Sequence, residues 1–293
     1  MHKSGFINII GSPNVGKSTL MNQLVGERLS IITSKAQTTR HRIHGIVNHE
    51  DYQIIFSDTP GIVDPAYKLH ESMLDFVKNA LVDADVLLVI TEVGEKVFKN
   101  SDLLDIINKL SIPVILMVNK IDTTDQEGLE EAMERWKEII PKAEIRPISA
   151  LLGFGVEELK NRLIELLPPG PAYYSKDELT DKPERFFVSE IIREKIFLNY
   201  KKEIPYACEV VVESFKEAED IIHMRAEIFV ERDTQKGIII GHQGKALKRV
   251  GTQARKDIEA FFDKKVFLDL FVKVDKDWRT NDLKLKKYGY IKK

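Results

Sequence analysis

This sequence of 293 residues has only one cysteine, no long apolar run and no metal-ligand pattern. Its single cysteine, Cys208, excludes an internal disulfide. The longest purely aliphatic stretch, Val86 to Ile90, is far too short to cross a bilayer. No signal-peptide pattern precedes the first strand-like segment, so we expect a protein of the reducing cytoplasm. The seven histidines show no spacing typical of a metal site.

Acidic and basic residues are unevenly distributed along the chain. The formal net charge is −2, but residues 236–293 contain 16 Lys and Arg against 7 Asp and Glu, a balance of +9. The first 235 residues therefore carry −11. An acidic body with a basic end predicts that the C-terminal part meets a polyanion, and a solvated basic face is the alternative.

Short apolar runs alternate with helical patterns over residues 1–167, which predicts an α/β domain with a mostly parallel six-stranded sheet. Only a few residues separate His44–Asn48 from Tyr52–Ser57, so these two strands should be antiparallel, since a parallel crossover needs about a dozen residues. The other expected strands are Phe6–Ile10, Val86–Thr91, Pro113–Asn119 and Ile145–Ile148. The expected helices are Lys17–Val25, Leu69–Leu81, Leu103–Leu110, Leu129–Ile139 and Val156–Leu167.

A proline-rich run over residues 168–185 breaks this pattern and is predicted to be a linker. A different element order follows, typical of a second, α+β domain over residues 186–276, before a basic tail at residues 277–293. The elements expected there are a helix at Glu190–Asn199, strands at Tyr206–Glu213 and Ile222–Glu231, two helices within Lys236–Phe262 and a strand at Val266–Val274.

The stretch GSPNVGKS, Gly11 to Ser18, fits the phosphate-binding pattern GxxxxGK[ST] between a strand and a helix. Its glycines let backbone N–H groups surround phosphates, and the helix N-terminus adds a favourable dipole. We expect Lys17 to reach the β- and γ-phosphates and the Ser18 hydroxyl to ligate Mg²⁺. The expected nucleotide contacts in this region are Gly11, Ser12, Pro13, Asn14, Val15, Gly16, Lys17, Ser18 and Thr19.

A second motif, DTPG, begins at Asp58, about forty residues after the phosphate-binding loop. Its carboxylate is expected near the metal, the Gly61 N–H near the γ-phosphate, and Thr59 and Pro60 beside the nucleotide. Ras-like enzymes follow this glycine with a glutamine that orients the attacking water. Here the next residue is Ile62, whose side chain can neither donate nor accept a hydrogen bond.

The segment between these motifs, residues 35–42, has no periodicity and should be a mobile switch. Thr39 is predicted to meet the metal and the γ-phosphate, and Thr38 is the alternative. Arg40 and Arg42 are candidates for a catalytic arginine supplied in cis, and each is equally explained as a solvated or RNA-facing charge.

The motifs NKID and SAL follow the last two strands of the first domain and predict guanine recognition. The Asp122 carboxylate can accept from both N1–H and the 2-amino group of guanine, which adenine cannot offer. Asn119 and Lys120 should brace the loop and cover the base, and the Ala150 N–H should donate to the guanine carbonyl. Ser149 and Leu151 complete the expected base contacts.

These motifs, with QTTRHR at residues 37–42 and a second domain after a proline-rich linker, make the chain resemble the Era family of bacterial GTPases over essentially its whole length. The resemblance implies a GTPase domain followed by a type II KH domain that binds the 3′ end of small-subunit ribosomal RNA during ribosome assembly. The matching KH signature is GHQG, and a GXXG loop clamps about four nucleotides. The expected RNA contacts are Gly241, His242, Gln243, Gly244, Lys245, Lys248 and Arg249. The alternative for this loop is a pair of helix caps.

The resemblance further implies that Ile62 is a family trait and that Asn14 ligates a potassium ion beside the phosphates. An ordinary turn residue is the alternative for Asn14. The catalytic set would then be Lys17, Thr39, Gly61 and Asn14. An RNA-binding adaptor with incidental hydrolysis is the alternative function, and peripheral contact with the inner membrane is an additional location.

Overall fold

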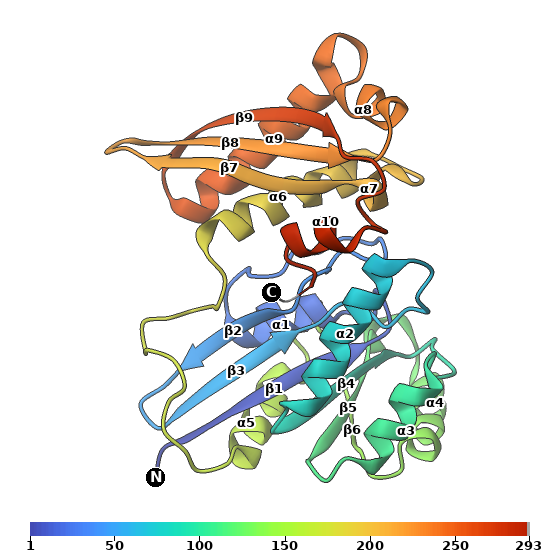
Figure 1. Ribbon diagram of the computed structural model, residues 1–293. Helices are drawn as coiled ribbons and strands as arrows, with labels where there is room; N and C mark the ends of the chain where they lie inside the picture. Colours follow the sequence, from blue (N-terminus) through green and yellow to red (C-terminus); the bar gives the residue numbers. More distant parts are fainter. Residues whose placement is uncertain (292–293) are drawn as a thin grey trace. The chain divides into compact units, whose positions relative to one another are not determined.

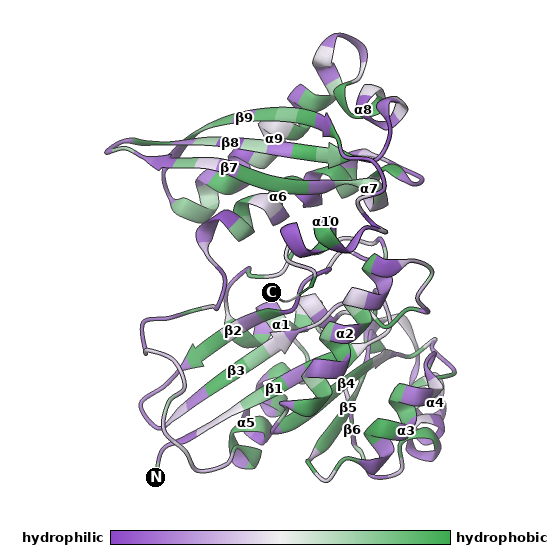
Figure 2. Cartoon of the chain, viewed as in Figure 1, coloured by the Kyte–Doolittle hydropathy of each residue, from purple (hydrophilic) through white to green (hydrophobic). Residues whose placement is uncertain are grey.

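The computed structural model describes residues 1–291, which divide into two compact units. The first unit comprises Met1–Ala66 and His70–Asp181, and the second comprises Tyr67–Leu69 and the residues from Lys182 onward. Each unit has its own sheet with apolar strands (Figure 1, Figure 2).

Six strands form the sheet of the first unit in the order β2-β3-β1-β4-β5-β6. β2 is antiparallel to β3 and all other neighbours are parallel, which confirms the predicted sheet. The strands are β1 (Lys3–Gly11), β2 (Ile43–Asn48), β3 (Tyr52–Asp58), β4 (Val86–Glu92), β5 (Val114–Asn119) and β6 (Glu144–Pro147).

Helices cover both faces of this sheet, which explains why β4 and β5 are apolar along nearly their whole length. Figure 1 shows α2 in front of the sheet and α1 and α5 behind it. Buried side chains of α2, α3 and α4 share one core cluster with those of the strands. The helices are α1 (Lys17–Val25), α2 (Lys68–Val82), α3 (Ser101–Lys109), η1 (Ile121–Thr123), α4 (Gln126–Ile139) and α5 (Val156–Leu166).

Most of the proline-rich segment packs against strands β2 and β3 of this sheet. The Ile46 N–H donates to Leu179 O at 2.8 Å, and Gln53 Oε1 accepts from the N–H groups of Tyr173 (2.7 Å) and Tyr174 (3.0 Å). Residues up to Asp181 consequently belong to the first unit, although their composition is typical of a free linker.

The second unit has a three-stranded sheet in the order β7-β8-β9. β7 is antiparallel to β8, β8 is parallel to β9, and α6 and α9 pack against one face. Its elements are α6 (Glu184–Asn199), α7 (Ile204–Ala207), β7 (Glu209–Glu217), β8 (Ile221–Val230), α8 (Asp233–Ile240), η2 (His242–Gly244), α9 (Lys245–Phe262), β9 (Lys265–Val274) and α10 (Asp282–Lys287).

The expected strand at Tyr206–Glu213 begins too early in the sequence. Ile204–Ala207 forms the short helix α7 instead, with Pro205 in its first turn. Proline is tolerated there because its missing N–H would have no intrahelical partner anyway. The apolar run therefore enters the sheet only at Glu209.

Up to Ile291, the C-terminal segment is folded onto the second unit, so this part of the chain is not a free basic tail. Trp278 is fully buried and its Nε1–H donates to Ala207 O at 2.9 Å. Tyr290 is also buried and its hydroxyl donates to Glu209 at 2.6 Å. The last two residues of the predicted tail, 292 and 293, lie outside the described residues. Among residues 1–291 no helix has the length and apolar character needed to cross a membrane.

Candidate functional site

The phosphate-binding loop joins β1 to α1 and requires glycine at the position before the lysine. Gly16 has a φ of 102°, a left-handed conformation that glycine adopts without strain. A Cβ at this position would lie 2.2 Å from Asn119 Nδ2. The loop therefore closes directly against the end of β5, which carries the expected base-recognition motif.

Lys17 is buried at the start of α1, with its ammonium group inside the loop. Its Nζ donates to Gly11 O at 3.1 Å and to Ser12 O at 2.7 Å. Burial lowers the pKa of Lys17 to about 8, although the carboxylates of Asp58 and Glu95 act in the opposite direction. A polyphosphate in the loop would bring negative charge next to this ammonium and favour its protonated form.

Three oxygen-bearing side chains meet at the N-terminus of α1. Ser18 Oγ lies 2.7 Å from Asp58 Oδ2 and 2.9 Å from Thr39 Oγ1. Burial raises the pKa of Asp58, although Lys17 and hydrogen bonds from hydroxyl groups act in the opposite direction. Within residues 1–291, Asp58 Oδ1 is buried and has no hydrogen-bond partner. Mg²⁺ prefers such oxygen ligands, and its charge would compensate the buried carboxylate, so these residues fit the ion.

The two threonines of the switch segment have different surroundings. Thr38 Oγ1 donates to Lys35 O at 2.7 Å and lies 2.5 Å from Thr33 Oγ1, so it bonds within its own loop. Thr39 is the residue whose hydroxyl meets Ser18. This placement favours Thr39 over Thr38 as the metal ligand.

The two arginines that follow are both held inside the first unit. Arg42 Nη1 and Nη2 donate to the two carboxylate oxygens of Asp83 at 2.6 and 2.8 Å, and Arg42 Nε donates to Ser57 Oγ at 2.5 Å. Arg40 is fully buried. A catalytic role for Arg42 would require it to leave this bidentate pair, so the geometry favours a structural role.

The DTPG turn is anchored to β1 and to the phosphate-binding loop. Thr59 Oγ1 donates to Ile9 O at 2.7 Å, and the Ile62 N–H donates to Gly11 O at 3.1 Å. The Ile62 side chain is only 2% exposed and belongs to the same core cluster as Val77 of α2. The position that holds the water-orienting glutamine in Ras-like enzymes is therefore filled here by a core residue.

At the base-binding end, Asn119 connects two loops. Its Nδ2 donates to Val15 O at 2.7 Å, and its Oδ1 accepts from the Ala150 N–H at 2.9 Å. Ser149 Oγ donates to Asp122 Oδ1 at 2.5 Å, which orients the carboxylate. The phosphate-binding loop and the two base-recognition loops are consequently one hydrogen-bonded unit.

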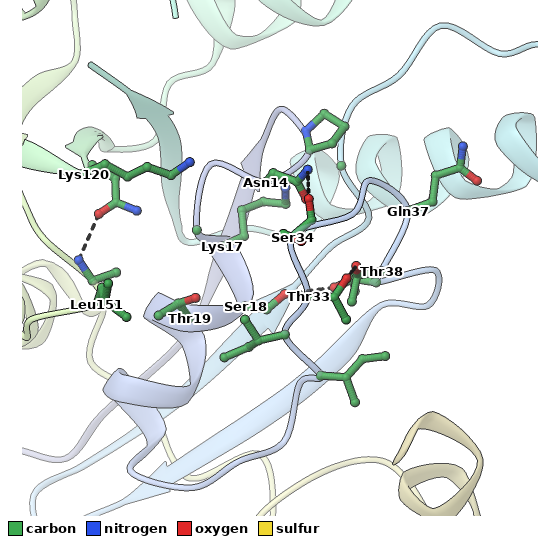
Figure 3. A pocket seen from close by; sticks show the side chains of 18 of the residues that line it. Asn14, Lys17, Ser18, Thr19, Thr33, Ser34, Gln37, Thr38, Lys120 and Leu151 are labelled. Atoms are coloured by element: carbon green, nitrogen blue, oxygen red, sulfur yellow. Dashed lines mark hydrogen bonds between the residues drawn. The ribbon is translucent and has the colours of Figure 1, made fainter. Parts of the chain in front are cut away.

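These segments surround one cavity of about 410 Å³, shown in Figure 3. In this view Lys120, which also pairs with Glu92, and Leu151 lie at one end, Gln37 lies at the other, and Lys17 lies between them. The cavity is lined by Pro13, Asn14, Gly16, Lys17, Ser18, Thr19, Ile31, Ile32, Thr33, Ser34, Gln37, Thr38, Thr39, Gly61, Asn119, Lys120, Asp122, Thr123, Ala150 and Leu151. The predicted nucleotide contacts outside this lining are Gly11, Ser12, Val15, Asp58, Thr59, Pro60 and Ser149.

Two contacts around this cavity were not predicted from the sequence. Ser12 Oγ donates to Glu95 in the loop after β4, and the other oxygen of that carboxylate accepts from Thr91 Oγ1 at 2.8 Å. Asn14 Nδ2 donates to Ser34 O at 3.0 Å and so links the phosphate-binding loop to the residue that precedes the switch. No local pattern marks these pairs, because the partners of Ser12 and Asn14 lie 83 and 20 residues away.

The GHQG loop of the second unit lies between α8 and α9, and its two glycines have different roles. Gly241 has a φ of 71°, and a Cβ there would lie 2.6 Å from Ala246 Cβ, so packing requires glycine. Gly244 also has a positive φ, 74°, but among residues 1–291 a Cβ there would meet nothing within 4 Å, so this position faces open space. His242 and Gln243 between them are exposed.

A second cavity, of about 340 Å³, extends from this loop along α9 and β9. Leu268 and Leu270 of β9 give it an apolar wall, and Lys248 and Arg255 of α9 add positive charge. Its lining residues are Gly244, Leu247, Lys248, Gly251, Thr252, Arg255, Leu268 and Leu270. Lys245 and Arg249, two predicted contacts, are exposed on α9 outside this lining. The contributions of Gly251 and β9 were not predicted, because no motif marks them.

Comparisons with known proteins find a match for each unit. Residues 6–120 match the family model described as 50S ribosome-binding GTPase, and residues 203–279 match the model of the KH domain. GTPase Era of Geotalea uraniireducens (strain Rf4) is 47% identical over 290 residues, which is 98% of each chain. A chloroplastic ERA-like GTPase of Oryza sativa subsp. japonica is 46% identical over 296 residues, 99% of this chain and 70% of the relative.

Two solved structures resemble the whole chain. One is Era in complex with MgGDPNP and nucleotides 1506–1542 of 16S ribosomal RNA, with 36% identity, a TM-score of 0.94 and full coverage of both chains. The other is a variant of Aquifex aeolicus Era bound to GDP and AlF₄⁻, with 37% identity, a TM-score of 0.94 and coverage of 99% of this chain and 100% of that chain.

Proposed function

This chain belongs to the Era family of GTPases, and from that premise we propose how its two units share the work. The protein is a GTPase that binds the 3′ end of small-subunit ribosomal RNA in assembly of the small subunit. We assign GTP to a domain at residues 1–167 and RNA to a KH domain at residues 186–276, joined by residues 168–185 and followed by residues 277–293. The observation that carries this proposal is that each unit has its own cavity, lined in part by residues of its predicted binding motif.

Hydrolysis in the first unit depends on cations and donors arranged around the γ-phosphate. Ser18, Thr39 and Asp58 would hold Mg²⁺, as their convergence at the start of α1 supports. The bound ion would neutralise charge that develops on the phosphate oxygens. Lys17 would exchange its two loop carbonyls for β- and γ-phosphate oxygens, and the Gly61 N–H would donate to the γ-phosphate.

Guanine specificity would come from Asp122, oriented by Ser149, with Lys120 and Leu151 covering the base and Ala150 donating to its carbonyl. The hydrogen bonds of Asn119 hold these groups at a fixed distance from the phosphate-binding loop. A rigid frame of this kind lets the carboxylate reject bases without two donors on one edge.

The buried Ile62 cannot orient the attacking water, so we assign this role to backbone groups of the DTPG turn and of the switch. We further propose that Asn14 ligates a potassium ion beside the phosphates. The Asn14 amide nitrogen donates a hydrogen bond to Ser34 O, and the amide oxygen is the atom that would ligate the cation. A cation there would take the place of a catalytic arginine, which agrees with Arg42 being bound to Asp83.

The groove in the second unit suits single-stranded RNA. Its leucines can contact bases, and Lys248 and Arg255 can contact phosphates. The open space at Gly244 lets a nucleic-acid backbone approach closely. The related Era complex contains the 3′-terminal region of 16S ribosomal RNA, and an RNA of nucleotides 1506–1542 is therefore the probe for this chain.

The alternative is an RNA-binding adaptor in which hydrolysis is incidental. Affinity for the 1506–1542 RNA, measured with a non-hydrolysable GTP analogue and with GDP, separates the two functions. A nucleotide-controlled switch should bind the RNA with different affinities when it holds the GTP analogue and when it holds GDP. Equal affinities in the two nucleotide states would favour the adaptor and exclude the switch.

We place the protein in the cytoplasm, where its ribosomal partner is assembled, and retain peripheral contact with the inner membrane as an additional location. The C-terminal segment buries Trp278, Leu285 and Tyr288, so within the described residues it offers lysines to a membrane and no extended apolar face. Such contact would be electrostatic, and high salt should abolish co-sedimentation with anionic vesicles.

A further inference from the structure

One face of the KH sheet carries aromatic residues that no helix within residues 1–291 covers. Along β9 the core contains Val266, Leu268, Leu270 and Val272, so the alternate residues project from the opposite face. These alternate residues are Lys265, Phe267, Asp269, Phe271 and Lys273. His223 and Arg225 of β8, paired with Phe267 and Asp269 in register, lie on the same face.

The C-terminal segment covers only part of this face. Phe229 of β8 is 7% exposed, and its ring centroid lies 5.5 Å from that of Tyr288. Phe267 and Phe271 remain 56% and 38% exposed. Two large aromatic side chains on the open half of a folded domain are a candidate contact surface.

A nitrogen-bearing side chain accompanies each ring. The Arg225 guanidinium lies 4.2 Å from the Phe271 ring centroid, and the His223 ring lies 5.6 Å from that of Phe267. The cations on this face are Lys216, Arg225, Lys265 and Lys273, against the carboxylates Asp269, Glu227 and Glu209, the last of which is buried under Tyr290. Glu227 is buried and already neutralised by Lys273 Nζ at 2.5 Å. Aromatic rings among cations match the bases and phosphates of single-stranded nucleic acid.

This face is continuous with the RNA groove through one edge strand. β9 is the last strand of the sheet. Leu268 and Leu270 line the groove on one side of β9, and Phe267 and Phe271 project from the other side. Single-stranded RNA that leaves the groove therefore reaches both rings by passing around the edge of β9.

We propose that Phe267 and Phe271 form a second stacking platform, which binds single-stranded RNA nucleotides adjacent to those held in the GHQG groove. The proposal rests on the RNA-binding function proposed above and extends it to the outer face of the sheet. The two residues are separated by four positions, about 13 Å along the strand, so each ring stacks a separate base. Arg225 holds the Phe271 ring in place and presents its own guanidinium plane to a base or phosphate.

The test compares a short and a long RNA on variants of the full chain. The short probe, of roughly six nucleotides from the 1506–1542 region, fills the groove alone, and the long probe is the whole 1506–1542 RNA. The variants are Phe267→Leu and Phe271→Leu, which keep apolar bulk and remove the ring, with Phe267→Tyr and Phe271→Tyr as ring-preserving controls. Because both positions are exposed, melting temperatures should stay close to the parent's.

Each leucine substitution should weaken the long probe by about 5- to 150-fold and leave the short probe unchanged, while tyrosine retains parental affinity for both. Parental affinity of the leucine variants for the long probe would refute the platform. If small-subunit particles, but not the long RNA, lost affinity for these variants, the face would be a protein contact and the proposal would be wrong. Failure of the parent to bind even the short probe would contradict the proposed RNA function itself, so the two failures are distinguishable.

Discussion

Replacing Asp122 with asparagine should change which base the protein accepts without removing its affinity for triphosphates. The carboxylate is placed to accept from N1–H and from the 2-amino group of guanine, and the amide of Asp122→Asn would present a donor toward one of them. Ser149 can keep its hydrogen bond, because its hydroxyl can donate to the new amide oxygen or accept from the new amide nitrogen. The effect should therefore be concentrated on the base.

The magnitude follows from one charge-assisted hydrogen bond that is lost and from one donor that is left facing another donor. The first costs about 1.5–3 kcal/mol and the second about 1–3 kcal/mol, so the total is about 2.5–6 kcal/mol, or on the order of 10²- to 10⁴-fold in GTP affinity. Xanthine has a carbonyl in place of the 2-amino group, which matches the donor of Asp122→Asn. Affinity for xanthosine triphosphate should rise as affinity for GTP falls.

Equilibrium titrations with fluorescent GTP and xanthosine triphosphate measure both changes. Asp125→Asn is the matched control, because Asp125 lies three residues away and caps α4 through the Gly128 N–H at 3.0 Å. Asparagine caps helices as well as aspartate does, so this control should retain its preference for GTP. Normal GTP affinity in Asp122→Asn would refute the assignment of guanine recognition to this carboxylate.

Ile62→Ala should lower the free energy of unfolding by about 2–4 kcal/mol, because it leaves a cavity in the core. The rate of single-turnover hydrolysis should change by less than roughly tenfold, and a loss of 10²-fold or more would contradict the purely apolar role of Ile62. Asn14→Ala should abolish the preference for K⁺ over Na⁺ in hydrolysis, and equal parental rates in the two salts would exclude the potassium site. Burial alone would raise the pKa of Asp275, but hydrogen bonds from Lys284 and Tyr288 lower this pKa below its ordinary value. Its carboxylate therefore stabilises the second unit above the ordinary aspartate pKa, about 4, and this contribution disappears as the pH falls through the lower folded value. Urea unfolding from pH 7 to pH 3 should show this loss for the parent, and an equally steep loss in Asp275→Asn would count against it.

Features encoded by contiguous residues could be predicted from the sequence. The phosphate-binding stretch Gly11–Ser18 lies between β1 and α1, and NKID lies at the end of β5, as strand and helix periodicity indicates. The antiparallel β2–β3 pair follows from its short connection. The individual roles assigned to residues in these motifs stay predictions.

Side-chain partners that come together only in the folded chain could not be predicted. Thr38 and Thr39 are adjacent and chemically identical, and only the folded switch brings Thr39 to Ser18. The sequence offers Arg42 as a catalytic candidate, whereas the fold pairs it with Asp83, 41 residues away. Local periodicity contains no information about such pairs.

The C-terminal segment was predicted incompletely for a related reason. Its lysines dominate the local composition and indicate a solvated tail, whereas four aromatic and aliphatic side chains, Trp278, Leu285, Tyr288 and Tyr290, are buried against the second unit. Few apolar residues at irregular spacing suffice to fold a segment when another surface supplies the rest of the core.

We propose that RNA bound in the second unit changes the rate of GTP hydrolysis in the first. Single-turnover GTP hydrolysis, measured with and without the 1506–1542 RNA, decides this when the parent is compared with a variant carrying His242→Asp and Gln243→Asp. Both positions are exposed in the GHQG loop, so two carboxylates there should repel phosphates without harming the core. RNA should change the parental rate and leave the variant's rate unchanged, while both proteins bind GTP equally. A parental rate that RNA does not alter, or a variant that still binds and responds to RNA, would contradict the coupling.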